Sequence, residues 1–531
     1  MPNTQNSTDA IIIGGGHNGL VCAYYLASNG LKVNIFERRS IIGGAAVTEE
    51  FHPEFKNSVA SYTVSLLNPE IIKEMKLKEY GLKIVKRPIS NFLPIDDKTY
   101  LKLGGGLERT QEEFKKFSEK DAAKLPEYYD RIEAVADVLR NISVKTPPNP
   151  KKGIKAVLGA ALQLWPIATK GNQVHRDVYD LFTKSARSFL DSWFENEHIK
   201  AAFGFDSIVG NFASPDTPGS AYVLLHHVFG EIDGEKGVWG HAIGGMGAIT
   251  QAMEKACKNM GVKIFTDAPV NKVIVKDNAA VGIELEDGSS IVANKIISNL
   301  NPKLLYKKLI SEDELEPEFN RGMDGYKCGS GTFRMNVALA ELPDFSVLPG
   351  KEVGEHHQSG IVIAPTLDYM DKAYIDAKSQ GWSSAPIVEM LIPSTIDNTL
   401  APDGKHVASL FCQQFSPTMP DGSSWHDHRL AAADTIIETV TKHAPNFRES
   451  ILGMMILSPL DLEEKFGLIS GDIMHGQMSL DQMWAARPLM NFGDYRGPLK
   501  SLYMCGSGTH PGGGVTGLPG KNAAREILKD V

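Results

Sequence analysis

Short apolar runs alternate with glycine-rich or polar turns through the first forty residues. The run Asp9–Ile13 is apolar after its first residue, which is typical of a strand buried in a parallel sheet. A helix is predicted over 20–28, with Gly30 as its C-terminal cap, and a second strand over 32–36. The order of strand, turn, helix and strand predicts a parallel βαβ unit.

The turn after the first strand has the spacing of a dinucleotide-binding loop. Gly14, Gly16 and Gly19 satisfy the pattern G-x-G-x-x-G, and Glu37 follows Gly19 by 18 residues (37 − 19). Glycines let the backbone approach a pyrophosphate, and the start of the next helix offers unpaired N–H groups. The Glu37 carboxylate can accept a ribose hydroxyl. A structural glycine turn is the alternative, but the complete unit favours dinucleotide binding.

Composition narrows the class of protein. The 531 residues are 42% hydrophobic and 22% charged, which is ordinary for a soluble chain of several domains. The net charge of -9 argues against nucleic acid as the main partner. The five cysteines form no C-x-x-C pair, which argues against dithiol redox chemistry, and no metal-ligand cluster is recognisable. Neither a membrane-spanning run nor a targeting peptide is evident, so the expected compartment is the cytoplasm.

A second glycine pair follows the acidic residue at once. Gly43 and Gly44 lie in the stretch 37–48, which resembles the FAD-binding start of the amine oxidase and phytoene desaturase superfamily. Members of that superfamily often have arginines beside this pair, where this chain has Ile41 and Ala45. The resemblance implies that the dinucleotide is FAD.

The end of the chain carries another glycine-rich loop after a strand predicted over 501–505. Gly512, Gly514 and Gly517 repeat the G-x-G-x-x-G spacing, but the 14 residues that follow (531 − 517) are too few for a second nucleotide-binding unit. This predicts a loop pressed against a flat ligand, followed by a helix over 522–529. The loop resembles the Gly-x-Gly-Thr-His-Pro-Gly-x-Gly signature of carotenoid desaturases, which implies that the helix start faces the N1–O2 edge of the isoalloxazine.

The whole chain resembles still more closely one branch, that of pyridine nucleotide-disulphide oxidoreductase domain-containing protein 2 and its bacterial relatives. The matching stretches are 43–50, 244–248, 494–496 and 506–517. The name of that branch implies a disulfide and a second nucleotide site, and this sequence carries neither a C-x-x-C pair nor a second complete unit.

The resemblance also implies a domain organisation. The fold class is α/β, with a Rossmann-like FAD-binding domain assembled from 1–105, 235–305 and 465–531. A mixed α+β substrate-binding domain is expected from 106–234, which looks mostly helical, and 306–464. The residues expected to contact FAD are Gly14, Gly16, His17, Asn18, Gly19, Glu37, Arg38, Gly43, Gly44, Ala45, Gly245, Met246, Val270, Gly506, Gly514 and Val515. Among them Val270 would meet the adenine through its backbone, and tight packing is the alternative for the pair at 244–245.

Candidate catalytic residues are few, because the flavin would carry the reaction. His510 lies in the C-terminal loop, His241 precedes the glycines at 244–245, and His475 and Arg487 fall just before the last strand. Histidine is the natural proton carrier if the substrate needs one. A structural hydrogen-bonding role is the alternative for each of the four.

The stretch 151–165 has two interpretations. Lys151, Lys152 and Lys155 precede the apolar segment Ala156–Trp165, a pattern that fits peripheral contact with a membrane. A core helix of the substrate domain is the alternative. The sequence leaves the oligomeric state open, a homo-oligomer included.

Three functions compete at this point. The leading hypothesis is an FAD-dependent oxidoreductase that transfers a hydride between flavin N5 and an apolar, polyene-like or lipid-like small molecule. The second is a flavin amine oxidase, which would need an aromatic cage beside the flavin. The third is a non-catalytic prenyl-lipid escort protein of the same fold, against which the intact glycine loops and Glu37 argue.

Overall fold

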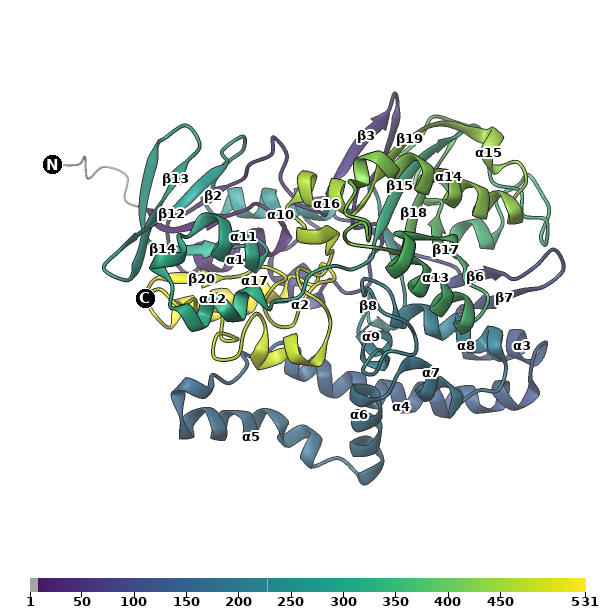
Figure 1. Cartoon of the computed structure of the whole chain (residues 1–531), viewed down its shortest axis with the longest axis horizontal. Helices are drawn as coiled ribbons and strands as arrows, with labels where there is room; N and C mark the ends of the chain where they lie inside the picture. The colour runs from purple at the N-terminus through teal and green to yellow at the C-terminus, as the bar shows by residue number, and fades with distance from the viewer. Residues whose placement is uncertain (1–7, 227) are drawn as a thin grey trace.

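The structure is a computed structural model that describes residues 8–226 and 228–531. Within these residues, two seven-stranded sheets lie toward opposite ends of the long axis (Figure 1). Strands from residues 8–36, 263–298 and 502–504 build the sheet at the left of the view, and strands from 91–103 and 333–457 build the sheet at the right.

The first sheet is a parallel core extended by an antiparallel hairpin. The parallel strands, in spatial order, are β11 (Lys263–Phe265), β2 (Val33–Phe36), β1 (Thr8–Ile13), β14 (Ser290–Ser298) and β20 (Leu502–Met504). The hairpin strands β13 (Ala279–Leu285) and β12 (Val270–Lys276) continue the sheet from the first residues of β14. Three separate segments of the chain thus assemble one Rossmann-like sheet, and the predicted α/β fold class is confirmed.

Helices α1 (His17–Ser28), α10 (Gly247–Asn259) and α17 (Leu518–Leu528) pack together over this sheet. The apolar run predicted from the pattern becomes its central strand, where Ile12 pairs with Ile35 on one side and Ile297 on the other. Helix α1 begins three residues earlier than predicted because Gly16 takes the N-cap position, and α17 begins directly after Gly517.

The second sheet is mixed and more deeply buried. Its strands, in spatial order, are β19 (Ile451–Leu457), β15 (Phe333–Leu339), β18 (His406–Phe415), β17 (Trp382–Leu391), β16 (Gly360–Ile363), β6 (Asn91–Pro94) and β7 (Tyr100–Leu103). Helices α13 (Leu367–Gln380) and α14 (Trp425–His443) pack against β17.

Two predicted domain boundaries need correction. Strands β6 and β7 pair with β16 in the second sheet, although the prediction placed residues up to 105 in the FAD-binding domain. Residues after 305 still belong to the first sheet's core, where Tyr306 and Phe319 pack with Ile11 and Ile296. Alternation of apolar and polar residues indicates that a strand is buried, but it does not indicate which sheet the strand joins. The sequence pattern therefore could not predict these two boundaries.

The first insert is helical, as predicted. Its helices are α3 (Leu107–Lys115), α4 (Glu119–Ser143), α5 (Ile154–Ala168), α6 (Asn172–Thr183), α7 (Ala186–Asp191), α8 (Glu197–Gly204) and α9 (Ala221–His226). Aromatic packing holds them together: the rings of Phe194 and Phe203 stack 5.3 Å apart, and Tyr128 lies against both.

Helix α5 is the exception among these helices. Of its side chains whose burial is described, Ala156 is buried, while five large apolar side chains are more than half exposed. The core-helix alternative for this stretch is therefore wrong.

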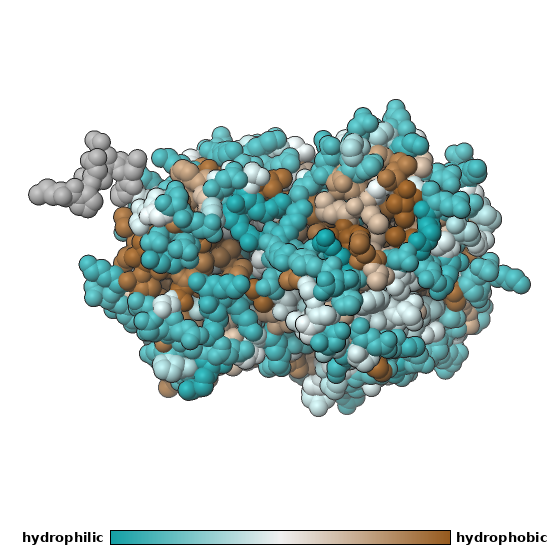
Figure 2. All heavy atoms as spheres, turned by 45° about the horizontal axis from the view of Figure 1, so that its top comes forward, coloured by the Kyte–Doolittle hydropathy of each residue, from teal (hydrophilic) through white to brown (hydrophobic). Residues whose placement is uncertain are grey.

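The face of the molecule drawn in Figure 2 is mostly hydrophilic. Figure 2 shows one face, on which hydrophobic areas lie toward the two ends and do not form one continuous band. Among the described helices, none combines the length and the apolar character needed to cross a bilayer.

Candidate active site

The turn between β1 and α1 has the geometry of an anion-binding loop. The amide of Gly14 donates to the carbonyl of Phe36, and Gly16 caps α1 without a capping side chain from the described chain. The first amides of α1 therefore keep their hydrogen-bonding capacity for a ligand. Glu37 lies beside this loop, accepting from the Gly15 amide at 2.7 Å and the Arg39 amide at 2.9 Å. A carboxylate has about four lone-pair positions, so it can still accept a ribose hydroxyl.

The two ends of the chain meet at this loop. Asn18 Nδ2 donates to Ser507 Oγ at 3.1 Å, and α17 packs directly on α1. One cavity, called here the central cavity, lies between them and encloses about 1270 Å³ with its open mouth. Eight of the predicted contact residues or their neighbours line it: Gly16, His17, Asn18, Gly44, Ala45, Ser507, Gly514 and Val515.

The central cavity contains polar atoms that need a ligand. His17 Nε2, Asn18 Oδ1 and His475 Nδ1 are buried, line this cavity and find no hydrogen-bond partner among the described residues. Burial, together with His475, lowers the pKa of His17 to about 3. Burial, together with Arg487, lowers the pKa of His475 to about 4. Both rings are therefore neutral at physiological pH, and such buried polar groups normally have a hydrogen-bonding partner.

His475 is the predicted catalytic residue that the structure places in the central cavity. It comes from the loop after α16 (Pro459–Phe466), in which its backbone is held at a positive φ of 59°. Glycine-like φ values for a histidine indicate that the surrounding structure fixes the position of this ring. The ring is therefore a preset hydrogen-bonding group facing the ligand.

Arg487 has a positioning role. It is fully buried, and its guanidinium donates to the carbonyls of Met474 at 2.7 Å and Ser507 at 2.9 Å. Because Met474 precedes His475 and Ser507 lines the cavity, Arg487 ties together two loops that form the cavity wall. The structural alternative therefore fits Arg487 better than a catalytic role.

Comparison with known proteins identifies the family of the chain. Residues 19–332 match the family described as flavin containing amine oxidoreductase. The chain is 39% identical to pyridine nucleotide-disulfide oxidoreductase domain-containing protein 2 of Rattus norvegicus, over 98% of this chain and 94% of the relative. It is 24% identical to a lycopene-forming phytoene desaturase of Pantoea ananas, over 98% and 99% of the two chains. A solved putrescine oxidase triple mutant superposes with a TM-score of 0.60 at 16% identity and 99% coverage of both chains.

The chain belongs to the flavin-containing amine oxidoreductase family. It is therefore an FAD-dependent oxidoreductase, as the resemblance predicted. The central cavity fits this cofactor, because a nucleotide loop, uncapped helix amides and unpaired polar atoms line one continuous space. The third hypothesis, a lipid escort protein without flavin chemistry, is wrong for this chain.

Several predicted FAD contacts lie just outside the cavity lining. Gly245 and Met246 pack against β3 (Thr48–His52) and β4 (Phe55–Ser58), where the Met246 amide donates to Ser58 Oγ at 2.9 Å. Arg38 donates to the Glu464 carbonyl at 2.9 Å. The packing of Gly245 against Thr48 and Ser58 fits the alternative given for 244–245, and the contact of Met246 with FAD stays a prediction.

The remaining predicted contacts, Gly14, Gly19, Gly43, Gly506 and Val270, also lie outside the lining of the central cavity. The first four support the loops from behind: a side chain on Gly506, for example, would meet the carbonyl of Asn299 at 2.6 Å. Val270 pairs with Leu285 at the start of β12. Its contact with the adenine stays a prediction.

Two predicted catalytic histidines lie outside the lining of the central cavity, and their catalytic role stays a prediction. His510 lines a separate cavity, and its Nε2 lies 3.2 Å from the Ile142 carbonyl. His241 is buried on β10 (Gly240–Ala242), where its Nε2 donates to Asp397 Oδ2 at 3.0 Å. Both histidines were selected because they lie beside glycine-rich stretches of the sequence. Their rings instead contact Asp397 and the Ile142 carbonyl, outside the lining of the central cavity.

The contact between His241 and Asp397 makes the free energy of unfolding depend on pH in the acidic range. Burial raises the pKa of Asp397, but hydrogen bonds from His241, Thr399 and the Gly244 amide outweigh it and hold this pKa at about 2, below the ordinary 3.8. A carboxyl whose pKa is depressed in the folded state stabilises it above the unfolded pKa and loses that contribution as the pH falls. We expect Asp397→Asn to cost about 2 kcal/mol at neutral pH and to remove the loss of stability between about pH 4 and 2.

Urea unfolding at a series of pH values measures this effect. Asp403→Asn, in the exposed turn at 402–404, is the matched control and should follow the wild type. Equal acid sensitivity of Asp397→Asn and wild type would show that Asp397 carries no such contribution.

The sequence reasoning missed the aromatic end of the central cavity. Tyr62 and Trp239 line it, and no motif marks either of them. The Tyr62 ring stacks on Phe411 at 5.2 Å and its hydroxyl donates to Glu389, while the Arg334 guanidinium lies 4.5 Å over the same ring. Arg334, Phe411 and Glu389 are direct cross-strand neighbours on β15, β18 and β17, so the second sheet presents this group to the FAD-binding domain.

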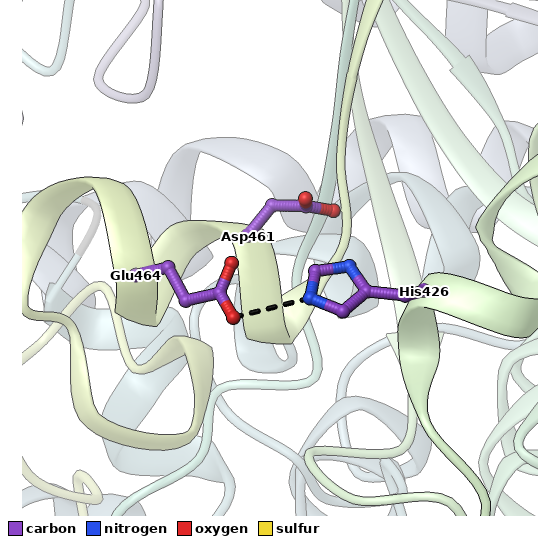
Figure 3. Close-up of side chains that lie close together, drawn as sticks. All are labelled: His426, Asp461 and Glu464. Carbon is purple, nitrogen blue, oxygen red and sulfur yellow. Dashed lines mark hydrogen bonds and ion pairs between the residues drawn. The ribbon is translucent and has the colours of Figure 1, made fainter.

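One surface cluster has the residue types of a metal site. His426, Asp461 and Glu464 have potential ligand atoms within 4.8 Å of one another (Figure 3). These atoms already have partners: His426 Nε2 contacts Glu464 Oε1 at 3.1 Å, and Asp461 accepts from Arg429 at 2.6 Å and from the Ser458 cap. The cluster therefore serves as the N-terminal cap and ion-pair network of α16.

Proposed function

We propose that the protein transfers a hydride between bound FAD and an apolar, alkene-containing small molecule. The observation that carries this proposal is a second cavity, called here the side cavity, which encloses about 1860 Å³ with its open mouth. Its walls are mainly apolar side chains, among them Leu139, Ile142, Leu164, Phe182, Tyr222 and Phe229. Ser65 and Leu66 line both the side cavity and the central cavity, so a ligand in one lies next to the other.

The division of work follows from the residues that line the two cavities. When bound, FAD supplies the hydride acceptor or donor at N5. The apolar walls exclude water and position a substrate by shape, since an alkene offers no strong hydrogen bond. Neutral His475 can hold or accept one hydrogen bond at the cofactor's edge. The similarity to a phytoene desaturase supports this substrate class.

Anaerobic reduction of the bound flavin tests the proposal. The holoprotein is mixed with a long-chain polyene precursor in detergent micelles, a monoterpene, or a primary diamine, and the absorbance near 450 nm is followed. The proposal expects bleaching by one of the alkenes and not by the diamine. For the reverse direction, dithionite-reduced protein is offered a conjugated polyene under the same conditions. Failure of every alkene in both directions would refute the proposal.

A flavin amine oxidase is the second candidate, favoured by one observation. Tyr62 and Trp239 both contribute aromatic rings to the lining of the central cavity, and aromatic lining is what an amine oxidase requires. Tyr62 is held by Phe411 and Glu389, so its ring cannot rotate freely around a substrate. Bleaching by the diamine and not by the alkenes would favour this candidate.

We expect His475→Ala to lower turnover about a hundredfold while the flavin stays bound, because a positioned hydrogen-bonding group is lost from the cavity. Turnover and the flavin-to-protein absorbance ratio are measured together. Because burial lowers the pKa of His475 to about 4, the wild-type profile should show no His475 inflection between pH 6 and 8. Wild-type turnover by the variant would remove His475 from the mechanism. His426→Ala, on the surface cluster, is the control.

A further inference from the structure

Helix α5 presents an apolar surface to the outside of the molecule. Ile154 is 79% exposed, Leu162 74% and Trp165 64%, and Val157 and Leu158 are also mostly exposed. In Figure 1 this helix lies at the lower left, set off from both sheets. A soluble helix normally buries its apolar face, so an apolar helix exposed in this way indicates a surface that binds something.

The charges around α5 indicate what it binds. Lys151, Lys152, Lys155 and Lys170 flank or begin the helix, and residues 151–171 contain no Asp or Glu, in a chain with a net charge of -9. Lys152 forms an ion pair with Asp494 at 3.0 Å, and the other lysines leave the segment positively charged. Lysines beside exposed Leu, Ile and Trp side chains are the features of a helix that lies in the interface of an anionic bilayer.

The same helix forms a wall of the side cavity. Leu164 and Ile167 line that cavity from α5, whereas His510 lines it from the C-terminal loop beside the FAD site. The outer face of α5 therefore faces the surroundings and its inner face encloses the space proposed for an apolar substrate. A molecule that leaves a bilayer beside α5 would reach the side cavity without crossing bulk water.

We infer that α5 docks on an anionic lipid surface, with its exposed apolar side chains inserted among the lipid headgroups and its lysines on the lipid phosphates. The second part of the inference rests on the proposed function: the apolar substrate passes from that bilayer into the side cavity. The positive charge around α5 disfavours pairing of this segment with the same segment of a second copy and favours an anionic bilayer, and Trp165 is the type of side chain enriched at the bilayer interface. The protein would then be peripheral on a membrane.

Flotation with vesicles tests the docking directly. Flavin-loaded protein is mixed with phosphatidylcholine vesicles with and without about a third of phosphatidylglycerol, and the floated fraction is measured. We expect binding to the anionic vesicles that falls at high salt, and at least a tenfold loss for Val157→Asp/Leu162→Asp. Leu430→Asp on α14, a position 66% exposed, is the matched control and should float like the wild type.

The remaining outcomes of the flotation experiment would contradict docking through α5. Wild-type protein that floats with neither vesicle, or a double variant that floats like the wild type, refutes docking through α5. If light scattering shows an oligomer that Val157→Asp/Leu162→Asp dissociates, and no vesicle binds, the occupant of this surface is a second copy and the inference is wrong. All variants are assayed for bound flavin first, so a folding defect is recognised.

The route for the substrate has its own readout. Flavin bleaching is compared for the same alkene given in detergent micelles and in anionic vesicles. We expect Val157→Asp/Leu162→Asp to lose at least tenfold in rate from vesicles and little from micelles. An equal rate from vesicles refutes the route. Absence of bleaching from both sources, with flotation intact, refutes the proposed function and leaves the docking established.

Discussion

Gly19→Ala should lower the flavin content of the purified protein. A β-carbon at this position would lie 2.5 Å from the Gly14 carbonyl oxygen and 3.3 Å from Asn299. The first contact is with a backbone atom, which cannot rotate away. The start of α1 must therefore move away from the loop at Gly14–Gly16, beside which its free amides lie. Overpacking of this kind costs about 1–3 kcal/mol, which corresponds to a loss of about tenfold to a hundredfold in cofactor affinity.

The ratio of absorbance at 450 nm to that at 280 nm in the purified protein measures this loss. Gly159→Ala is the matched control, because a β-carbon at this partly exposed helical position meets no heavy atom of the described chain within 4 Å. The control should remain yellow. A Gly19→Ala protein with wild-type flavin content would show that α1 does not need its close approach to Gly14.

Glu389→Ala should destabilise the protein by about 3 kcal/mol. Glu389 is buried on β17 and accepts the hydrogen bond of Tyr62, with Arg87 and Arg334 near enough to influence its ionisation. Burial raises the pKa of Glu389, and both arginines oppose that rise. Removal of the carboxyl leaves the partly buried Tyr62 hydroxyl without its acceptor, and it leaves the guanidinium groups of buried Arg334 and partly buried Arg87 without a nearby anion. Both losses are costly.

Urea unfolding followed by flavin release and tryptophan fluorescence measures the difference. Tyr62→Phe removes the hydrogen bond and keeps the anion, so it should cost about 1 kcal/mol. Glu438→Ala, which loses an exposed ion pair with Lys442 at 3.3 Å, should cost less than about 1 kcal/mol. Equal costs for the Glu389 and Glu438 variants would mean that the buried carboxyl does not balance these arginines.

Prediction from the sequence succeeded where the chemistry is local. The G-x-G-x-x-G loop, its flanking strands and Glu37 lie within one βαβ unit, and the structure places them as that unit requires. The second glycine loop, which was interpreted as a wall against the same ligand, lines the central cavity through Gly514 and Val515, and its contact with FAD stays a prediction. In both cases the residue types at fixed spacings restrict the backbone directly, so a single sequence is informative.

The sequence could not show which of the candidate histidines faces the central cavity. His510 follows a glycine signal and His475 does not, yet His475 faces the central cavity and His510 faces the side cavity. The direction of each ring depends on the loop that carries it. Arg487 holds the loop of His475 through the Met474 carbonyl, 13 residues away, and Tyr495 holds the other loop through the His510 carbonyl, 15 residues away. Such contacts leave no periodic or spaced pattern.

By itself, the sequence determined the dinucleotide-binding unit at the start of the chain, because this unit depends on glycine spacing and on apolar runs that act over a few residues. The family and the three-segment organisation followed from the resemblance to known proteins. The tertiary structure alone decided which side chains share a cavity. It brought Tyr62 onto Phe411 between Glu389 and Arg334, moved β6 and β7 into the second sheet, and left α5 exposed. The physical reason is that these outcomes depend on packing between segments hundreds of residues apart, where burial is set by the partner surface and not by the segment's own composition.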